Sequence, residues 1–203
     1  MSVRRSARIA RLLFRAVGWE THGDPPPLCK YVLLAAPHTS MWDFALVYLL
    51  TFVYDLRISF LMKHSMFVGP VGWWLRRVGG IPVRRQLREN LVGELATLFR
   101  TQDRLVLVVA PEGTRAESAY WKSGFYQVAH QAGVPVVLGY LDFGRRRAGF
   151  GPALTLSGDA ATDMDEIRKF YSDKTGLYPS LVGPIRLREE DAGDGSARPP
   201  AGS

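Results

Sequence analysis

His38 and Asp43 stand five positions apart in the segment HTSMWD, residues 38–43, which has the form HxxxxD. An aspartate that is bonded to one imidazole nitrogen fixes the tautomer of the ring. It also stabilises the imidazolium that forms when the other nitrogen takes a proton. Such a pair can act as a general base. The alternative is a histidine beside a helix cap, and the spacing alone does not separate the two interpretations.

The two side chains can meet only if His38 precedes the helix that carries Asp43, because five residues along one helix turn through about 140°. The apolar run 31–36 predicts a buried strand that ends at Pro37, and residues 41–54 have the composition of a helix. Thr39 or Ser40 can cap that helix. We therefore expect His38 on the loop between strand and helix.

A second polar segment, PEGTR at residues 111–115, follows the apolar run 105–110 in the same way. Its glycine, Gly113, permits close backbone approach, and Arg115 can grip a phosphate with two hydrogen bonds. The alternative is a charged turn closed by an internal pair of Glu112 and Arg115. Chance gives this pentapeptide on the order of 10⁻⁴ times in such a chain, which favours a functional site.

Apolar strands alternate with helices along the chain, which predicts an α/β fold with a mostly parallel central sheet flanked by helices. In such folds the reactive loops gather at the carboxyl ends of the strands. The RRR segment at 145–147 is predicted to be a solvated turn. The predicted strands are residues 31–36, 58–62, 81–84, 105–110, 134–141 and 153–156, and the predicted helices are 41–54, 65–77, 87–100, 124–132 and 164–174.

The length of 203 residues and the hydrophobic content of 47% support one sizeable core. We divide the chain into residues 1–29, a basic amphipathic helix with a proline-rich linker, a domain over 30–188, and a disordered tail over 189–203. The helix can lie on an anionic membrane or pack on its own domain. Its arginine stripe is Arg4, Arg8, Arg11 and Arg15, and its broad apolar face is Ile9, Leu12, Leu13, Ala16 and Val17.

The formal net charge of +7 suits an anionic partner. Nucleic acid is not expected, because the arginines are spread among motifs and no RNP, KH or helix-turn-helix pattern occurs. The longest uncharged apolar stretch, residues 44–54, is shorter than the ~20 residues that cross a bilayer. The pairs Trp73-Trp74 and Arg76-Arg77 instead form an interfacial patch. The single cysteine, Cys29, excludes an internal disulfide.

In order and spacing, HTSMWD and PEGTR resemble the motifs of the glycerolipid acyltransferase superfamily, which contains the PlsC-type lysophosphatidic acid acyltransferases. Two further segments agree. GIPVRR at 80–85 is similar to the glycine-to-arginine block between those motifs, and VPVV at 134–137 is similar to the hydrophobic proline block that follows them. The resemblance spans roughly residues 30 to 140, which is most of the predicted domain.

The resemblance implies an O-acyltransferase that moves a fatty acyl group from coenzyme A or acyl carrier protein to a hydroxyl of a lysophospholipid or a related phosphorylated lipid. His38 would be the general base and Asp43 its orienting partner. The acyl thioester is a co-substrate, and no metal or other cofactor is implied. The enzyme would work at the cytoplasmic face of the cell membrane, as a peripheral or monotopic protein. The expected substrate-binding residues are Ser40, Lys63, Arg84, Arg85, Glu112, Gly113, Thr114, Arg115 and Lys122.

Several alternatives stay open beside this interpretation. Lys63 is also compatible with a solvated loop, and Lys122 with a plain helix start. Pro37, Pro82 and Arg84 depart from the pattern of the superfamily, and Arg84 beside Arg85 favours a more anionic acceptor. Two other classes of function fit the same residues. One is a thioesterase or lipid hydrolase in which the pair activates water, and the other is a non-catalytic protein that binds anionic membranes.

Overall fold

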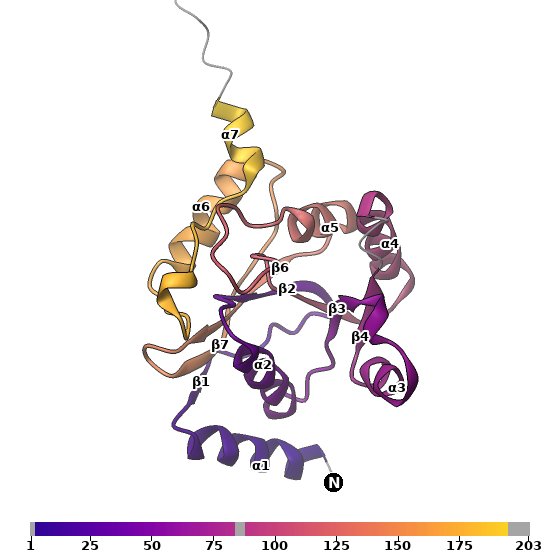
Figure 1. Ribbon diagram of the computed structural model, residues 1–203, viewed down its shortest axis with the longest axis vertical. Helices are drawn as coiled ribbons and strands as arrows, with labels where there is room; N and C mark the ends of the chain where they lie inside the picture. The colour runs from indigo at the N-terminus through magenta and orange to yellow at the C-terminus, as the bar shows by residue number, and fades with distance from the viewer. Residues whose placement is uncertain (1–2, 84–87, 195–203) are drawn as a thin grey trace, which may run out of the picture.

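The computed structural model describes residues 3–83 and 88–194. A seven-stranded sheet with the order β1-β7-β6-β2-β5-β3-β4 runs through its centre, with helices on both sides (Figure 1). Only β6 and β7 pair in the antiparallel sense among these strands. The predicted α/β fold with a mostly parallel sheet is confirmed. The strands are β1 (Glu20–His22), β2 (Lys30–Ala36), β3 (Ser59–Lys63), β4 (Gly80–Val83), β5 (Leu105–Val109), β6 (Val136–Asp142) and β7 (Arg147–Leu154).

Helices connect the parallel strands by crossovers that cover both sides of the sheet. The chain moves outward from β2 to β3 and β4 through α2 and α3, and it returns to β5 and β6 through α4 and α5. Right-handed crossovers therefore place α2 and α3 on one side, together with α1, and α4 and α5 on the other, together with α6 (Figure 1). The helices are α1 (Val3–Ala16), α2 (Met41–Val53), α3 (Gly69–Arg77), α4 (Arg88–Thr101), α5 (Gly124–Ala132), α6 (Ala160–Tyr171) and α7 (Arg188–Asp194), and the 3₁₀ turns are η1 (His64–Met66) and η3 (Pro179–Leu181).

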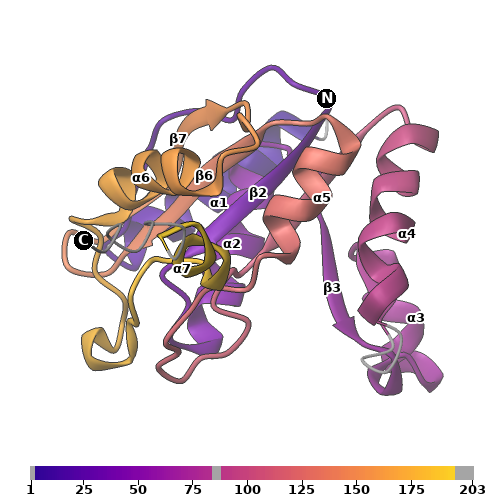
Figure 2. The ribbon, with the colours of Figure 1, turned by 90° about the horizontal axis from the view of Figure 1, so that it is seen from above.

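The central strand β2 shows why the strands are apolar without interruption. Val32 and Leu34 belong to the core on the side of α4 and α5, whereas Tyr31 and Leu33 belong to the core beneath α2. Because both faces of β2 are covered, alternation of polar and apolar residues is absent. The view in Figure 2 shows β2 crossing the middle of the molecule between the two helical layers.

The carboxyl ends of the parallel strands form one edge of the sheet. β2 pairs with β5, β5 with β3, and β3 with β4, all in parallel. The segments that follow these four strands therefore emerge side by side. They include His38 after β2, the PEGTR segment after β5, and Lys63 at the end of β3.

Two strands at the far side of the sheet differ from the prediction. β7 begins at Arg147, inside the predicted solvated turn, and only its last residues overlap the predicted strand 153–156. Its centre contains glycine and proline, which have low strand propensity and conceal it in the sequence. β1 has three exposed residues and was not predicted, because it gains its place by pairing with β7. The predicted helix 65–77 is divided into η1 and α3.

The first and last described helices, α1 and α7, both contact the rest of the domain. Phe14 of α1 is fully buried, and it packs with Trp19 and Leu50 in a small core between α1 and α2. Residues 188–194 form α7, and Glu190 accepts a hydrogen bond from Arg168 at 2.9 Å. The predicted disordered tail is therefore wrong over 189–194, and the rest of it lies outside the described residues. Among the described residues, none of the helices has the length and apolar character to span a bilayer.

Candidate active site

The turn from β2 into α2 brings His38 and Asp43 together, as predicted. Ser40 is the N-cap of α2 in extended conformation, and its Oγ accepts a hydrogen bond from the backbone N of Trp42 at 2.9 Å. Asp43 is the third residue of the helix, and its Oδ2 accepts from the backbone N of Ser40 at 2.8 Å. This reciprocal capping box turns the Asp43 carboxylate back toward the strand end. Nδ1 of His38 lies 3.1 Å from the same Oδ2.

The surroundings of the pair suit proton transfer. The side chain of Asp43 is 3% exposed and that of His38 is 23% exposed, so the carboxylate is buried behind the ring. With Nδ1–H donating to Asp43, Nε2 is the nitrogen that can take a proton from a substrate hydroxyl. Asp43 Oδ2 also accepts from the backbone N of Thr39 at 2.8 Å. One carboxylate oxygen thus caps the helix and orients the imidazole.

Glu112 lies beneath the histidine, at the end of the neighbouring strand β5. Its carboxylate is buried, and Oε1 accepts a hydrogen bond from the backbone N of His38 at 3.0 Å. Burial raises the pKa of Glu112, and the hydrogen bond from His38 opposes that rise. Glu112 makes no ion pair with Arg115 among the described residues, so the alternative of an internally paired turn is wrong. Oε1 of Glu112 thus supports the His38 backbone, and the contact of Glu112 with the acceptor stays a prediction.

The last three residues of PEGTR, Gly113, Thr114 and Arg115, are exposed, whereas Pro111 is buried. Gly113 has a φ of +67°, and a methyl group added to it would come within 2.9 Å of Cγ of Lys122. The stem of Lys122 therefore passes over this glycine, as the close-approach interpretation requires. Thr114 and Arg115 are exposed beside it. Three predicted anion-binding residues, Gly113, Arg115 and Lys122, thus lie on the one connection between β5 and α5.

Other predicted substrate-binding residues lie elsewhere. Lys63 is exposed at the end of β3, in register with Val83 of β4. Arg84 and Arg85 follow Val83 and lie outside the described residues. Ser40 is buried and its Oγ accepts the capping hydrogen bond from Trp42, and its contact with substrate stays a prediction.

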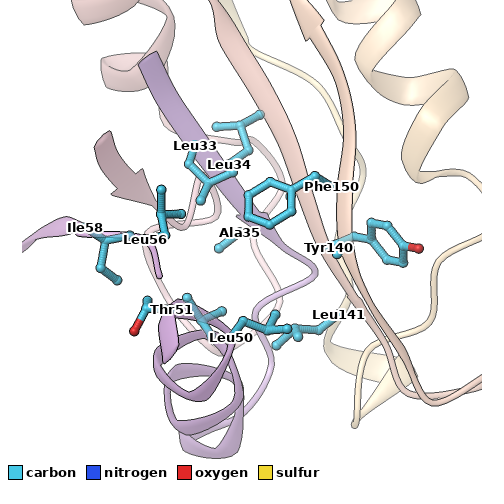
Figure 3. Close-up of a pocket in the computed structure, with 13 residues that line it drawn as sticks. Leu33, Leu34, Ala35, Leu50, Thr51, Leu56, Ile58, Tyr140, Leu141 and Phe150 are labelled. Atoms are coloured by element: carbon cyan, nitrogen blue, oxygen red, sulfur yellow. The ribbon is translucent and has the colours of Figure 1, made fainter. Parts of the chain in front are cut away.

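A small apolar cavity lies between the second half of α2 and the sheet (Figure 3). Its lining includes Leu33, Leu50, Ile58 and Phe150, and its volume is about 30 Å³. Pockets that hold small molecules occupy roughly 300 Å³ or more. The cavity is therefore too small to hold a fatty acyl chain in this conformation. No cluster of three or more His, Cys, Asp or Glu suited to a metal occurs within residues 3–83 and 88–194.

One contact beside the dyad, the hydrogen bond between Tyr178 and Thr39, could not have been predicted from the sequence. Thr39 is buried beside His38, and its Oγ1 accepts a hydrogen bond from the backbone N of Tyr178 at 3.2 Å. The two residues are 139 positions apart. A contact of this kind depends on a backbone donor, which any residue except proline supplies. No pattern of residue types around Tyr178 could have revealed it.

Comparisons with known proteins agree with this geometry. A model of the family described as Acyltransferase matches residues 21–138, which is more than half of the chain. The fold is similar to that in the crystal structure of the 1-acyl-sn-glycerophosphate (LPA) acyltransferase, PlsC, from Thermotoga maritima. The TM-score is 0.54 at 15% sequence identity, over 97% of this chain and 81% of that chain. No curated protein sequence matches significantly.

Proposed function

The chain belongs to the Acyltransferase family, within the glycerolipid acyltransferase superfamily, and from this premise we propose its reaction. It transfers a fatty acyl group from an acyl thioester, bound to coenzyme A or acyl carrier protein, to a hydroxyl of a lysophospholipid or a related phosphorylated lipid. The observation that carries the proposal is the 3.1 Å contact between His38 Nδ1 and Asp43 Oδ2 at the carboxyl edge of the sheet.

The proposed reaction proceeds by direct attack. Nε2 of His38 takes the proton of the acceptor hydroxyl while the hydroxyl oxygen attacks the carbonyl carbon of the thioester. The imidazolium is stabilised by Asp43. As the tetrahedral intermediate collapses, the C–S bond breaks and the leaving thiolate receives the proton from His38. General base catalysis of this kind supplies ~10²–10⁴-fold, and positioning of the two substrates supplies the rest.

The charges around the dyad support an anionic acceptor. Arg115 and Lys122 are exposed on the loops after β5, and Lys63 is exposed at the end of β3. We place the phosphate of the acceptor among these cations, with Arg115 as the residue suited to two parallel hydrogen bonds. Arg84 and Arg85 follow Val83 in the sequence, and we propose that they add to this positive charge.

The exposed apolar residues support a membrane surface as the working location. In α1, Ala10 and Phe14 face the domain, whereas Ile9, Leu12 and Leu13 are 58%, 66% and 53% exposed. The helix therefore attaches to its domain by a narrow stripe and leaves its broad apolar face uncovered. The helix thus packs on its own domain through Phe14, and this packing leaves the broad apolar face free for a membrane.

Exposed apolar side chains extend beyond α1 over one side of the molecule. Apart from Tyr178, all exposed large apolar side chains among the described residues lie between Ile9 and Trp74, in and around α1, α2 and α3. Helices α4, α5 and α6, on the other side of the sheet, have none among their described residues. We propose that the side bearing α1, α2 and α3 rests on the cytoplasmic face of the cell membrane, peripherally or monotopically.

The positive charge on α1 and α3 favours a membrane with anionic lipids. Exposed arginines accompany the apolar residues, namely Arg8, Arg11 and Arg15 on α1 and Arg76 and Arg77 on α3. Each arginine near an anionic leaflet contributes about 1 kcal/mol of binding. An anionic membrane is therefore the expected partner, and it presents lipid acceptors to the site.

Product analysis tests the reaction. Purified protein is mixed with acyl-CoA or acyl carrier protein donors and a panel of lysophospholipids, and the products are identified by mass spectrometry. We expect an acylated phospholipid that His38→Ala abolishes and that His130→Ala, an exposed histidine on α5, leaves unchanged. Free fatty acid released at full rate without acceptor would identify a hydrolase instead. Undiminished acyl transfer by His38→Ala would refute the mechanism.

A further inference from the structure

The segment of residues 175–183, which we term the strap, lies against the catalytic corner. The backbone N of Tyr178 donates to Oγ1 of Thr39, and Gly176 packs on the same side chain. Thr39 in turn donates its backbone N–H to Asp43. A continuous series of contacts therefore runs from the strap through Thr39 to the carboxylate that holds His38.

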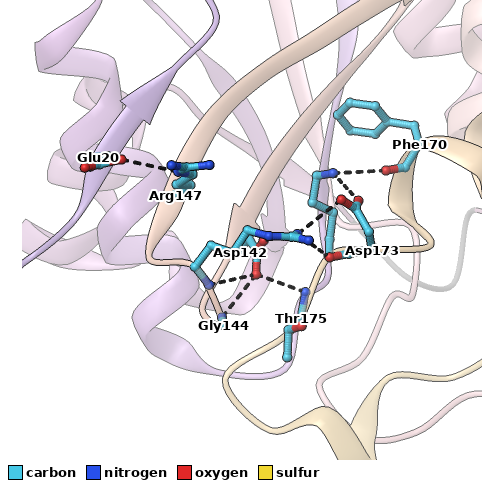
Figure 4. A network of polar contacts seen from close by, with 9 residues as sticks. Glu20, Asp142, Gly144, Arg147, Phe170, Asp173 and Thr175 are labelled. Carbon is cyan, nitrogen blue, oxygen red and sulfur yellow. Dashed lines mark hydrogen bonds and ion pairs between the residues drawn. The ribbon is translucent and has the colours of Figure 1, made fainter.

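The first end of the strap is fixed by a buried carboxylate at the end of β6. Asp142 is 1% exposed, and its Oδ1 accepts hydrogen bonds from the backbone N of Gly144 at 3.1 Å and of Thr175 at 3.3 Å (Figure 4). The carbonyl of Thr175 accepts from the backbone N of Phe143 at 2.8 Å. Thr175 is thus held by both of its backbone groups. Arg145 links Asp142 to Asp173, which lies two residues before the strap. Its Nη1 donates to the carboxylate of Asp142 at 2.9 Å and to the carbonyl of Asp173 at 2.7 Å.

The second end of the strap is fixed to the loop that follows PEGTR. A methyl group added to Gly183 would come within 2.1 Å of the carbonyl oxygen of Ser118, so the two backbones are in direct contact. Just beyond the strap, the carbonyl of Arg186 accepts from the backbone N of Trp121 at 2.8 Å. The strap therefore spans from the HxxxxD corner to the loop that bears Lys122.

We propose that the strap positions the catalytic pair, and that Thr39 and Gly176 are positioning residues for His38 and Asp43. The proposal rests on the proposed acyl transfer. It assigns a function in catalysis to a segment beyond residues 21–138, the part that the family model matches. The strap holds the buried Thr39 side chain in place, and Thr39 holds one of the three hydrogen bonds that orient the Asp43 carboxylate.

Gly176 offers a sharp test, because the space beside it is filled by Thr39. A methyl group at this position would lie 2.9 Å from Cγ2 of Thr39, 3.0 Å from Oγ1 of Thr39 and 3.1 Å from Cγ2 of Val182. Thr39 is 4% exposed and its hydroxyl is bonded, so a shift of its side chain disturbs the hydrogen bond to Tyr178. Gly176→Ala therefore displaces the residue between His38 and Ser40.

The experiment measures kcat and KM for acyl transfer in Gly176→Ala, beside its folded fraction from thermal unfolding. A displacement of about 1 Å at a catalytic group costs as much as 10²-fold, so we expect kcat to fall by roughly 10- to 100-fold while KM changes less. Adding Thr39→Ser removes the Cγ2 atom and keeps the hydroxyl, so the double variant should recover most of the lost kcat. Gly93→Ala on α4 is the matched control, because nothing lies within 4 Å of the added methyl group.

Wild-type kcat in Gly176→Ala, or a loss that only follows the unfolded fraction, would overturn the proposal. Failure of Thr39→Ser to rescue would do the same. If Gly176→Ala does not fold, Thr39→Val decides, since it keeps the shape and removes the acceptor for Tyr178. Its kcat must then fall in a folded protein for the proposal to stand. Activity that persists in His38→Ala would instead refute the proposed function itself.

Discussion

Replacing Asp43 with asparagine separates the two functions that this carboxylate combines in the structure. Oδ2 of Asp43 accepts three hydrogen bonds, from the backbone N of Thr39, the backbone N of Ser40 and Nδ1 of His38. Asparagine keeps one carbonyl oxygen of nearly the same position and loses the charge. The helix cap is therefore largely retained, while the stabilisation of the His38 imidazolium is lost.

The expected size of the effect follows from the geometry. At 3.1 Å and an effective dielectric constant of about 20, the carboxylate and the imidazolium attract each other by about 5 kcal/mol. Because the His38 side chain is 23% exposed, this value is an upper bound. Each 1.36 kcal/mol is a tenfold change in rate, so kcat should fall by about 10²- to 10⁴-fold. The free energy of unfolding should fall by only about 1–3 kcal/mol.

Ser40→Ala is the matched control for the cap. It removes the hydrogen bond to the backbone N of Trp42, which costs about 1 kcal/mol of stability, and it leaves all three bonds of Asp43 intact. We expect its kcat to stay within about tenfold of the wild type. Acyl transfer kinetics and urea unfolding of both variants provide the comparison. Equal losses of kcat in the two variants would show that the pair only caps the helix, and the catalytic interpretation would fail.

Three further predictions concern other parts of the molecule. Burial raises the pKa of Glu112, so its contribution to stability is complete below its unfolded pKa and is lost as pH rises through the folded pKa. Wild type should therefore lose unfolding free energy relative to Glu112→Gln from about pH 4 upward, and a difference that stays constant with pH in urea unfolding would contradict this. Trp73→Ser with Trp74→Ser should weaken sedimentation with anionic vesicles, whereas Tyr178→Ser should not, and equal binding by all variants would exclude α3 from the membrane contact. Phe14→Ala should cost about 3–5 kcal/mol and expose α1 to proteolysis, and wild-type protease resistance would show that α1 is held by other contacts.

The catalytic corner could be predicted because its physics is local. Pro37 ends a strand, Ser40 caps a helix and Asp43 stands in its first turn, so seven neighbouring residues fix the geometry between them. The central parallel sheet was equally accessible, since its strands are apolar runs separated by helices. In both cases the residue types match the structure that they adopt.

The parts that escaped prediction depend on contacts between distant segments. Glu112 and Arg115 look alike in sequence as charged members of one motif, yet the fold buries the first under His38 and leaves the second exposed. β1 forms because β7 offers it a partner, and its own residues are polar. The bond from Tyr178 to Thr39 uses the backbone, which has no residue preference.

His38 is held from two independent directions, which explains why each motif contributes one carboxylate at this edge. Asp43 binds the imidazole, and Glu112 binds the backbone N of the same residue. Burial, and to a smaller extent the charge of Asp43, raises the pKa of Glu112 and so disfavours its ionised form. The fold nevertheless retains both, because one fixes the ring and the other fixes the chain that carries it. Precision in the position of the base is therefore obtained against an electrostatic cost, as expected where rate depends on the geometry of attack.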